Sequence, residues 1–115
     1  MRYVLFVMLL GACTSLNTAA PNCYIACTNG IDLIHIERGL RGDTRAYALQ
    51  HEDCHITLEH KWPPNLAMEM DADRCAEDRT LEIGISPCPA ARLLKQSGEI
   101  RRAEALGVRN SCEGF

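Results

Sequence analysis

The sequence predicts a small α+β domain, in which an N-terminal β-hairpin is followed by three to four helices and stapled by disulfides. Its 115 residues suffice for one domain. Two β-prone runs flank Asn29-Gly30, the strongest short hairpin signal, and the later segments carry helix start and stop signals. Seven cysteines in so short a chain favour an exported, disulfide-bonded domain.

The first residues resemble a bacterial lipoprotein signal. Arg2 supplies a positive start, and residues 4–10 form an apolar run that is too short to span a bilayer. The run LGAC, ending at Cys13, resembles the lipobox, where cleavage before the cysteine leaves a thiol that carries lipid. We therefore expect a signal peptide at 1–12, then a lipidated Cys13 and a small, polar tether at 13–22.

This resemblance implies a location in the bacterial cell envelope. Thr14, rather than Asp, follows the cysteine, which by analogy favours a lipid anchor on the periplasmic side of the outer membrane. The alternative is plain secretion after ordinary cleavage near Ala19 or Ala20, a site that Pro21 disfavours. The formal net charge of −3 gives no reason to expect a nucleic acid as partner.

With Cys13 lipidated, six cysteines remain, enough for three bridges in an oxidising compartment. Cys23 and Cys27 lie four residues apart on an extended segment, so that roughly 13 Å separates their Cα atoms, too far for a mutual bridge. We expect each of them to pair elsewhere and to tie the hairpin to the helices. The disulfide candidates are Cys23, Cys27, Cys54, Cys75, Cys88 and Cys112.

The two longer helices are bounded by caps and breakers. Asp43 is a good N-cap for a first helix that runs to about Lys61, where the run WPP at 62–64 ends it. Asn65 caps a second helix, from Leu66 to about Ile83.

Two shorter helices follow. Gly84 stops the second helix, and Pro87 and Pro89 open a third with the sequence ARLLKQ. A fourth, GEIRRAEAL, closes at Gly107. The expected order is therefore a hairpin over residues 24–37 and then helices, as in small α+β domains.

The first helix carries two histidines on its inward stripe. His51 and His55 are four residues apart, on adjacent turns, which is the arrangement that lets two imidazoles bind one ion. Glu52 follows the first of them and completes an HExxH motif. The apolar character of the stripe predicts that it faces the interior; its members are Tyr47, Ala48, His51, Cys54, His55 and Leu58.

The second helix offers a third ligand. Glu69 and Asp73 share a face with Ala72 and Ala76, and two stacked carboxylates repel each other unless a positive charge is near. A Zn²⁺ ion bound to Glu69, with Asp73 accepting the free N–H of a ligand histidine, would remove that repulsion. The alanines would let this helix approach the first one closely.

HExxH followed by E-x-x-A-D-x-x-A resembles the gluzincin metallopeptidases. His60 and the run GISPCPAARLL are similar to the family of the CAAX-prenyl endopeptidase and the bacterial periplasmic heat-shock metallopeptidases, over roughly residues 44–95. The resemblance implies a minimal zincin-like domain at 23–115. In it His51, His55 and Glu69 would bind Zn²⁺, Glu52 would be the general base, and Asp73 would hold a ligand from behind.

The chain departs from that pattern in three ways. Only 13 residues separate His55 from Glu69, fewer than is usual. Cys54 stands inside the motif, where a bridge to another element, with Cys75 as one candidate, would keep a thiolate away from the ion. No His or Tyr follows residue 60 to serve as a transition-state donor; the remaining candidates are Arg92, Arg101, Arg102 and Arg109.

Three other side chains have no expected part in the chemistry. His35 alternates with two isoleucines on a strand and should face solvent, and His60 should be a surface residue near the end of its helix. Trp62 is expected to fill the junction between helix and loop rather than to bind a substrate.

The resemblance implies a zinc-dependent peptidase that acts on a peptide or unfolded-protein substrate. The competing expectation is a non-catalytic, disulfide-rich lipoprotein that binds an envelope protein partner and keeps the metal site as structure or vestige. The absent downstream donor and the small size favour the second; the intact Glu52 favours the first, because a structural site has no need of a base there. An enzyme that works only when a partner completes its cleft is a third possibility.

Overall fold

The computed structural model describes residues 9–10, 15–16 and 26–115. Strands β1 (Leu9–Leu10) and β2 (Ser15–Leu16) pair in antiparallel fashion. The expectations for the rest of the signal peptide, for Cys13, for most of the tether and for Cys23 fall on residues outside these ranges. Among the described residues, no helix is long and apolar enough to cross a membrane.

The hairpin is present, but its loop is longer than a two-residue turn. Strands β3 (Ala26–Thr28) and β4 (Ile34–Ile36) pair in antiparallel fashion, with Cys27 opposite His35. The side-chain Oδ1 of Asn29 accepts the backbone N–H groups of residues 31, 32 and 33 at 2.9–3.0 Å. Asn29 thus organises a five-residue loop at 29–33, because one side chain satisfies three backbone donors. His35 is half-buried rather than facing solvent.

Four helices follow the hairpin, as expected: α1 (Gly42–Thr57), α2 (Leu66–Glu82), α3 (Cys88–Gln96) and α4 (Ile100–Arg109). Asn65 caps α2 as predicted, since its side chain accepts the N–H of Met68. The predicted cap of α1 was wrong: Arg41 holds the N-cap position, and Asp43 lies in the first turn.

Two predicted helix ends were also wrong. Helix α1 stops at Thr57 instead of continuing to about Lys61, and at Glu59 the backbone enters the left-handed region with φ of 57°. Helix α4 passes through Gly107 and ends at Arg109. Gly107 is buried against the ring of Phe115, where a Cβ would clash, so packing accounts for this glycine and no helix stop is needed.

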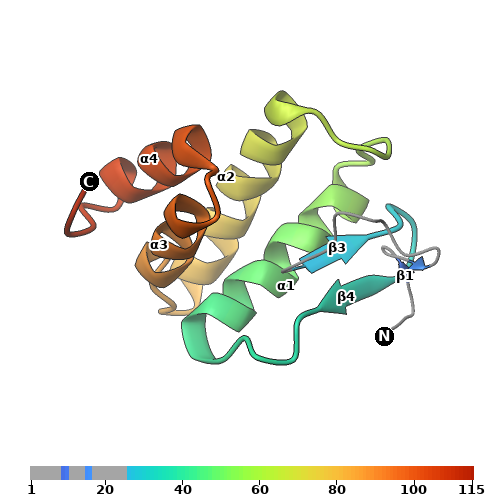
Figure 1. The fold of residues 1–115 in the computed structure, drawn as a ribbon, viewed down its shortest axis with the longest axis horizontal. Helices are drawn as coiled ribbons and strands as arrows, with labels where there is room; N and C mark the ends of the chain where they lie inside the picture. The colour runs from blue at the N-terminus through green and yellow to red at the C-terminus, as the bar shows by residue number, and fades with distance from the viewer. Residues whose placement is uncertain (1–8, 11–14, 17–25) are drawn as a thin grey trace.

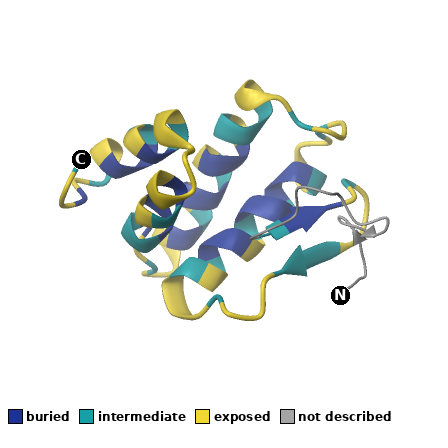
Figure 2. Ribbon diagram, in the orientation of Figure 1, coloured by how far each residue is buried: buried dark blue, intermediate teal, exposed yellow. Residues whose placement is uncertain are grey.

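The site region is formed by α1 and its neighbours. Figure 1 shows α1 between the β3–β4 hairpin and α2, which runs back alongside it, while α3 and α4 pack at the other side of the molecule. Buried residues concentrate on β3 and on the inner sides of α1 and α2 (Figure 2). The alanines Ala72 and Ala76 are fully buried, as predicted for a close approach of α1 and α2.

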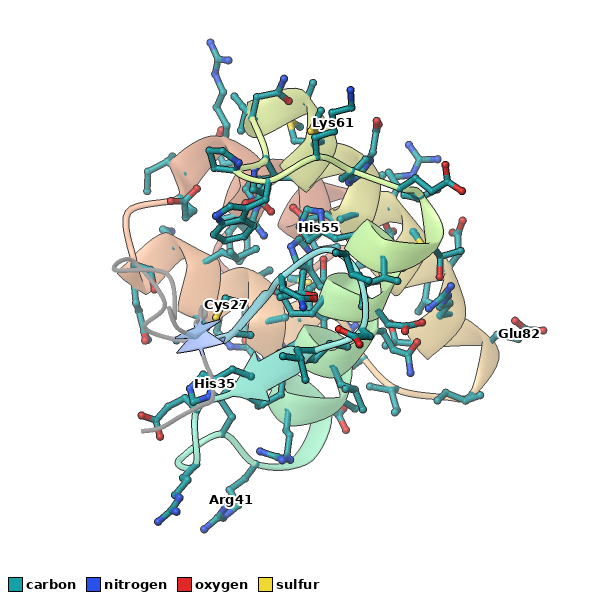
Figure 3. The ribbon with its side chains drawn as sticks, turned by 90° about the vertical axis from the view of Figure 1, so that its right-hand side faces the viewer. Cys27, His35, Arg41, His55, Lys61 and Glu82 are labelled. Carbon is teal, nitrogen blue, oxygen red and sulfur yellow. A yellow bond between two sulfur atoms is a disulfide. The ribbon has the colours of Figure 1, made fainter. Side chains whose placement is uncertain are left out.

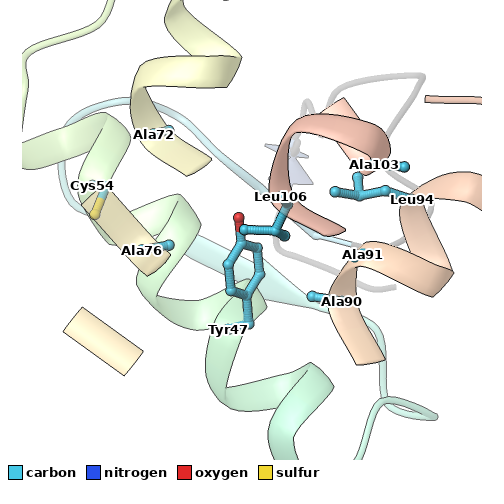
Figure 4. Close-up of a cluster of buried hydrophobic side chains, with 9 residues drawn as sticks. All are labelled: Tyr47, Cys54, Ala72, Ala76, Ala90, Ala91, Leu94, Ala103 and Leu106. Carbon is cyan, nitrogen blue, oxygen red and sulfur yellow. The ribbon is translucent and has the colours of Figure 1, made fainter. Parts of the chain in front are cut away.

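The core is built largely from small side chains (Figure 4). Alanine has no side chain beyond Cβ, so helices pack closely but each residue removes little apolar area from water. The cluster consists of Tyr47, Cys54, Ala72, Ala76, Ala90, Ala91, Leu94, Ala103 and Leu106.

Two disulfides reinforce this core. Cys54 on α1 pairs with Cys75 on α2, the candidate raised by the HExxH motif, and Cys88 pairs with Cys112. The expectation that Cys27 ties the hairpin to the helices is therefore wrong, because Cys54, Cys75, Cys88 and Cys112 pair among themselves; the same expectation for Cys23 falls outside the described residues. Cys27 is also disulfide-bonded, and its partner is not among the described residues.

Replacing both cysteines of either pair with alanine should lower the free energy of unfolding by about 3 kcal/mol, because each bridge closes a loop of 21 or 24 residues in the unfolded chain. Urea denaturation of C54A/C75A and of C88A/C112A measures this. A loss below about 1 kcal/mol in both variants would contradict the view that the bridges supplement a small core.

Candidate metal site

His51 and His55 project from the same face of α1 because they are four residues apart on a helix. Both residues are buried, at 5% and 3% exposure, and their rings meet edge to face with centroids 4.7 Å apart. Figure 3 shows His55 directed into the molecule, whereas Arg41 and Glu82 point outward. The inward stripe predicted for this helix is confirmed at Tyr47, Ala48, His51, Cys54 and His55, while Leu58 is exposed.

Glu69 on α2 meets both histidines at one point. Its Oε1 lies 2.9 Å from Nε2 of His51 and 3.0 Å from Nε2 of His55, and the two Nε2 atoms are 3.1 Å apart. Three ligand atoms at bonds of 2.0–2.1 Å around a tetrahedral ion are separated by about 3.3 Å. The group His51, His55 and Glu69 could therefore hold a metal ion with little adjustment.

Glu52 lies beside this group. Its side chain is buried, with 6% exposure, and its Oε2 is 3.9 Å from Nε2 of His51. Burial raises the pKa of the Glu52 carboxyl group, and the neighbouring histidines only partly counter this. A carboxylate with a raised pKa takes up and releases a proton closer to neutrality than a solvated one does.

Asp73 supports the site from behind. It is buried on α2, with 3% exposure, and its Oδ1 lies 2.9 Å from Nδ1 of His51. That distance suits a hydrogen bond, but the N–H of His51 is not well aligned with the oxygen. Tyr47 donates its hydroxyl to the same oxygen at 2.8 Å, and Arg102 donates through Nε and Nη2 to the two carboxylate oxygens at 2.8 and 3.0 Å.

These contacts set the protonation of the metal-free site. Burial alone would raise the pKa of Asp73, but the close contact with His51 and the hydrogen bonds from Arg102 outweigh it and lower the pKa to about 2. Burial alone would lower the pKa of His51, but its contacts with Asp73 and Glu69 and the charge of Glu52 raise it to about 10. The two histidines likewise hold the pKa of Glu69 well below its usual range, against the effect of burial.

His60 was expected to be a surface residue with no derived role, and it is half-buried instead. Its Nδ1 lies 2.9 Å from Nδ1 of His55. Burial and the nearby His55 lower the pKa of His60, so its ring is neutral and can accept the N–H of His55. The early end of α1 explains the difference, because the left-handed backbone at Glu59 turns the chain back and His60 N–H donates to the carbonyl of His55.

Trp62 was expected to fill the junction between helix and loop, but it is 48% exposed. It borders a cleft of about 760 Å³, into which His51, Glu52, His55 and Glu69 open. The cleft receives apolar side chains from the α1–α2 loop and from α3; they are Trp62, Pro63, Pro64, Ala90, Leu93 and Leu94.

Of the four arginines considered as donors, the structure brings only Arg102 to the cleft. Arg92, Arg101 and Arg109 are exposed, and Arg109 binds the buried Glu77 instead. Tyr47 and Arg102 were not expected to bind Asp73. Tyr47 is four residues before His51 and shares its face, a signal that was present in the sequence; Arg102 is 29 residues from Asp73, and no local pattern links them.

Comparison with known proteins yields no relative: no protein-family model, no curated protein and no solved structure matches this chain.

The metal-free protein should lose the stabilisation by Asp73 as pH falls. The folded-state pKa of about 2 lies below the ordinary 3.8, so this contribution is present above pH 4 and lost as pH falls through 2. Asp73→Asn should therefore be less stable than wild type by about 2 kcal/mol at pH 6, and the difference should shrink toward pH 2.

Urea denaturation of both proteins between pH 2 and 6, after chelation of metal, measures this difference. Asp71→Asn controls for the loss of one charge at an exposed position of α2. A stability difference between Asp73→Asn and wild type that stays constant over the whole pH range would contradict the argument.

Proposed function

We propose that this protein is a zinc-dependent peptidase, with His51, His55 and Glu69 as the zinc ligands and Glu52 as the general base. The observation that carries the proposal is the position of Glu52, buried 3.9 Å from His51 and open to the same cleft as the possible metal ligands. A site that served structure alone would have no need of a carboxylate there.

The donor set supports zinc. Two imidazole nitrogens and one carboxylate oxygen are the protein ligands of one kind of catalytic zinc site, and three protein ligands leave a fourth position open. When bound, zinc would supply Lewis acidity that lowers the pKa of water and polarises a carbonyl group.

The remaining residues would position and move protons. Glu52 would accept the proton of the attacking water and deliver it to the amine that leaves the cleaved peptide bond. Asp73 and His60 each face the Nδ1 of one ligand histidine and would keep its Nε2 lone pair directed at the ion. Arg102 would bring positive charge to the cleft, although two of its nitrogens already bind Asp73.

The proposal includes the envelope location. The resemblance of the first residues to a lipoprotein signal supports a lipid anchor at Cys13 and a periplasmic site of action on peptides or unfolded proteins. The observed disulfides suit an oxidising compartment.

A second candidate is a non-catalytic lipoprotein that binds an envelope protein partner, with the metal site structural or vestigial. Its support is that no His or Tyr follows residue 60, so that the chain lacks the usual neutral donor for a transition state. Arg102 is the only one of the four candidate arginines at the cleft, and it is engaged with Asp73.

Glu52→Gln should lower peptide hydrolysis at least about a hundredfold and leave zinc bound, because the amide cannot accept a proton. His51→Ala should lose zinc. Zinc content of the purified, oxidised protein and cleavage of a mixed peptide pool measure both effects. Equal hydrolysis by Glu52→Gln would refute the role of Glu52, and wild type that holds zinc but cleaves no peptide would favour the second candidate.

The Cys54–Cys75 bridge should matter for the metal beyond its effect on stability, since it joins the helix of the histidines to the helix of Glu69. We expect C54A/C75A to bind zinc about tenfold or more weakly than wild type, because freedom between α1 and α2 must then be lost on binding. C88A/C112A, whose bridge lies outside the site, is the matched control. Competition with a chelator gives the affinities, and equal losses in both variants would contradict this coupling.

A further inference from the structure

Trp62 is a large aromatic residue that borders the cleft. Nearly half of the residue's surface is in contact with solvent, at 48% exposure. Burying such a surface against a ligand is favourable, because it removes apolar area from water. The other large apolar residues that are exposed among the described residues, for example Leu81, Ile83 and Val108, do not line the cleft.

Two prolines restrain the backbone that follows Trp62. Pro63 and Pro64 follow directly and fix two φ angles, and Asn65 then caps α2 through the N–H of Met68. A backbone that is restrained before a ligand arrives loses less conformational entropy on binding. The restraint therefore lowers the entropic cost of placing a ligand against Trp62.

The cleft combines apolar residues with the reactive groups. Leu93 and Leu94 from α3 line it together with Trp62, Pro63 and Pro64. Its polar lining includes His51, Glu52, His55, Glu69 and Arg102 and, outside the site already described, Thr44, Ser97 and Glu99. An extended peptide that placed a carbonyl group at the histidines would have an apolar wall within reach of a neighbouring side chain.

We propose that this cleft selects peptides with a large apolar side chain, aliphatic or aromatic, beside the bond at the metal site, and that Trp62 determines this preference. The inference rests on the proposed function, and it adds the substrate class and one specificity residue. A charged or very small side chain leaves Trp62 in water and gains nothing from the wall.

The test uses peptide hydroxamates, whose hydroxamate group chelates zinc, with an adjacent leucine, phenylalanine, alanine or aspartate side chain. Calorimetric titration of the purified, zinc-loaded protein measures their affinities, and Trp62, the only tryptophan of the chain, reports contact through its fluorescence. The leucine and phenylalanine compounds should bind about tenfold more tightly than the alanine compound, and the aspartate compound more weakly still.

In Trp62→Ala, the affinity ratio between the leucine or phenylalanine compound and the alanine compound should fall below about threefold. Trp62→Phe should restore the ratio. Leu81→Ala, at a position equally exposed at 48%, should leave it unchanged. Zinc content and thermal unfolding verify that the variants are folded. Equal affinities for all four compounds in wild type, or an unchanged ratio in folded Trp62→Ala, would overturn the inference.

Hydrolysis of peptides distinguishes failure of this inference about the cleft from failure of the proposed function. If the protein binds the hydroxamates with the expected differences in affinity but cleaves no peptide, the preference of the cleft is supported and the proposed peptidase activity is refuted. If peptides are cleaved at equal rates whatever the side chain beside the cleaved bond, the proposed peptidase activity is supported and the preference for apolar side chains is refuted.

Discussion

The carboxylate of Asp73 is the group on which the rest of the structure depends. It is almost fully buried, and a buried charge is costly unless it is paired and hydrogen-bonded. Here Tyr47 and His51 from α1 and Arg102 from α4 meet it on α2. If the carboxylate were absent, the buried guanidinium of Arg102 would lack its partner, and His51 would lose the group that faces its Nδ1. One side chain thus unites three helices and orients a possible metal ligand.

This polar contact matters because the apolar core is small. Ala72, Ala76 and Ala103 are fully buried and allow helices to approach closely, but each contributes little to hydrophobic stabilisation. The bridges Cys54–Cys75 and Cys88–Cys112 and the network around Asp73 supplement it. The close approach of α1 and α2 is also what brings Glu69 to the histidines, so the packing that compacts the domain builds the site.

Local periodicity accounts for what could be predicted from sequence. The four-residue spacings of His51 with His55 and of Glu69 with Asp73 follow from the helical repeat, and the cap at Asn65 depends on its own side chain. The hydrogen bond from Arg102 to Asp73 joins residues that are 29 apart in the chain. Which of the four candidate arginines reaches Asp73 depends on the orientation of α4. The surroundings of His60 and Trp62 were predicted wrongly because they depend on the residue at which α1 ends. The exact end of a helix is difficult to predict from local sequence.

The site has two sides with different physical characters, and this division bears on function. Behind the histidines, Asp73 has its hydrogen bonds satisfied by protein groups and is closed to solvent. In front, Glu52 and Glu69 open to a cleft with an apolar wall. A metal site that only stabilised a fold would gain from closure on both sides, because structural sites fill all positions with protein ligands. The open face, with the buried carboxylate of Glu52 beside it, is the arrangement that the proposed peptidase would need.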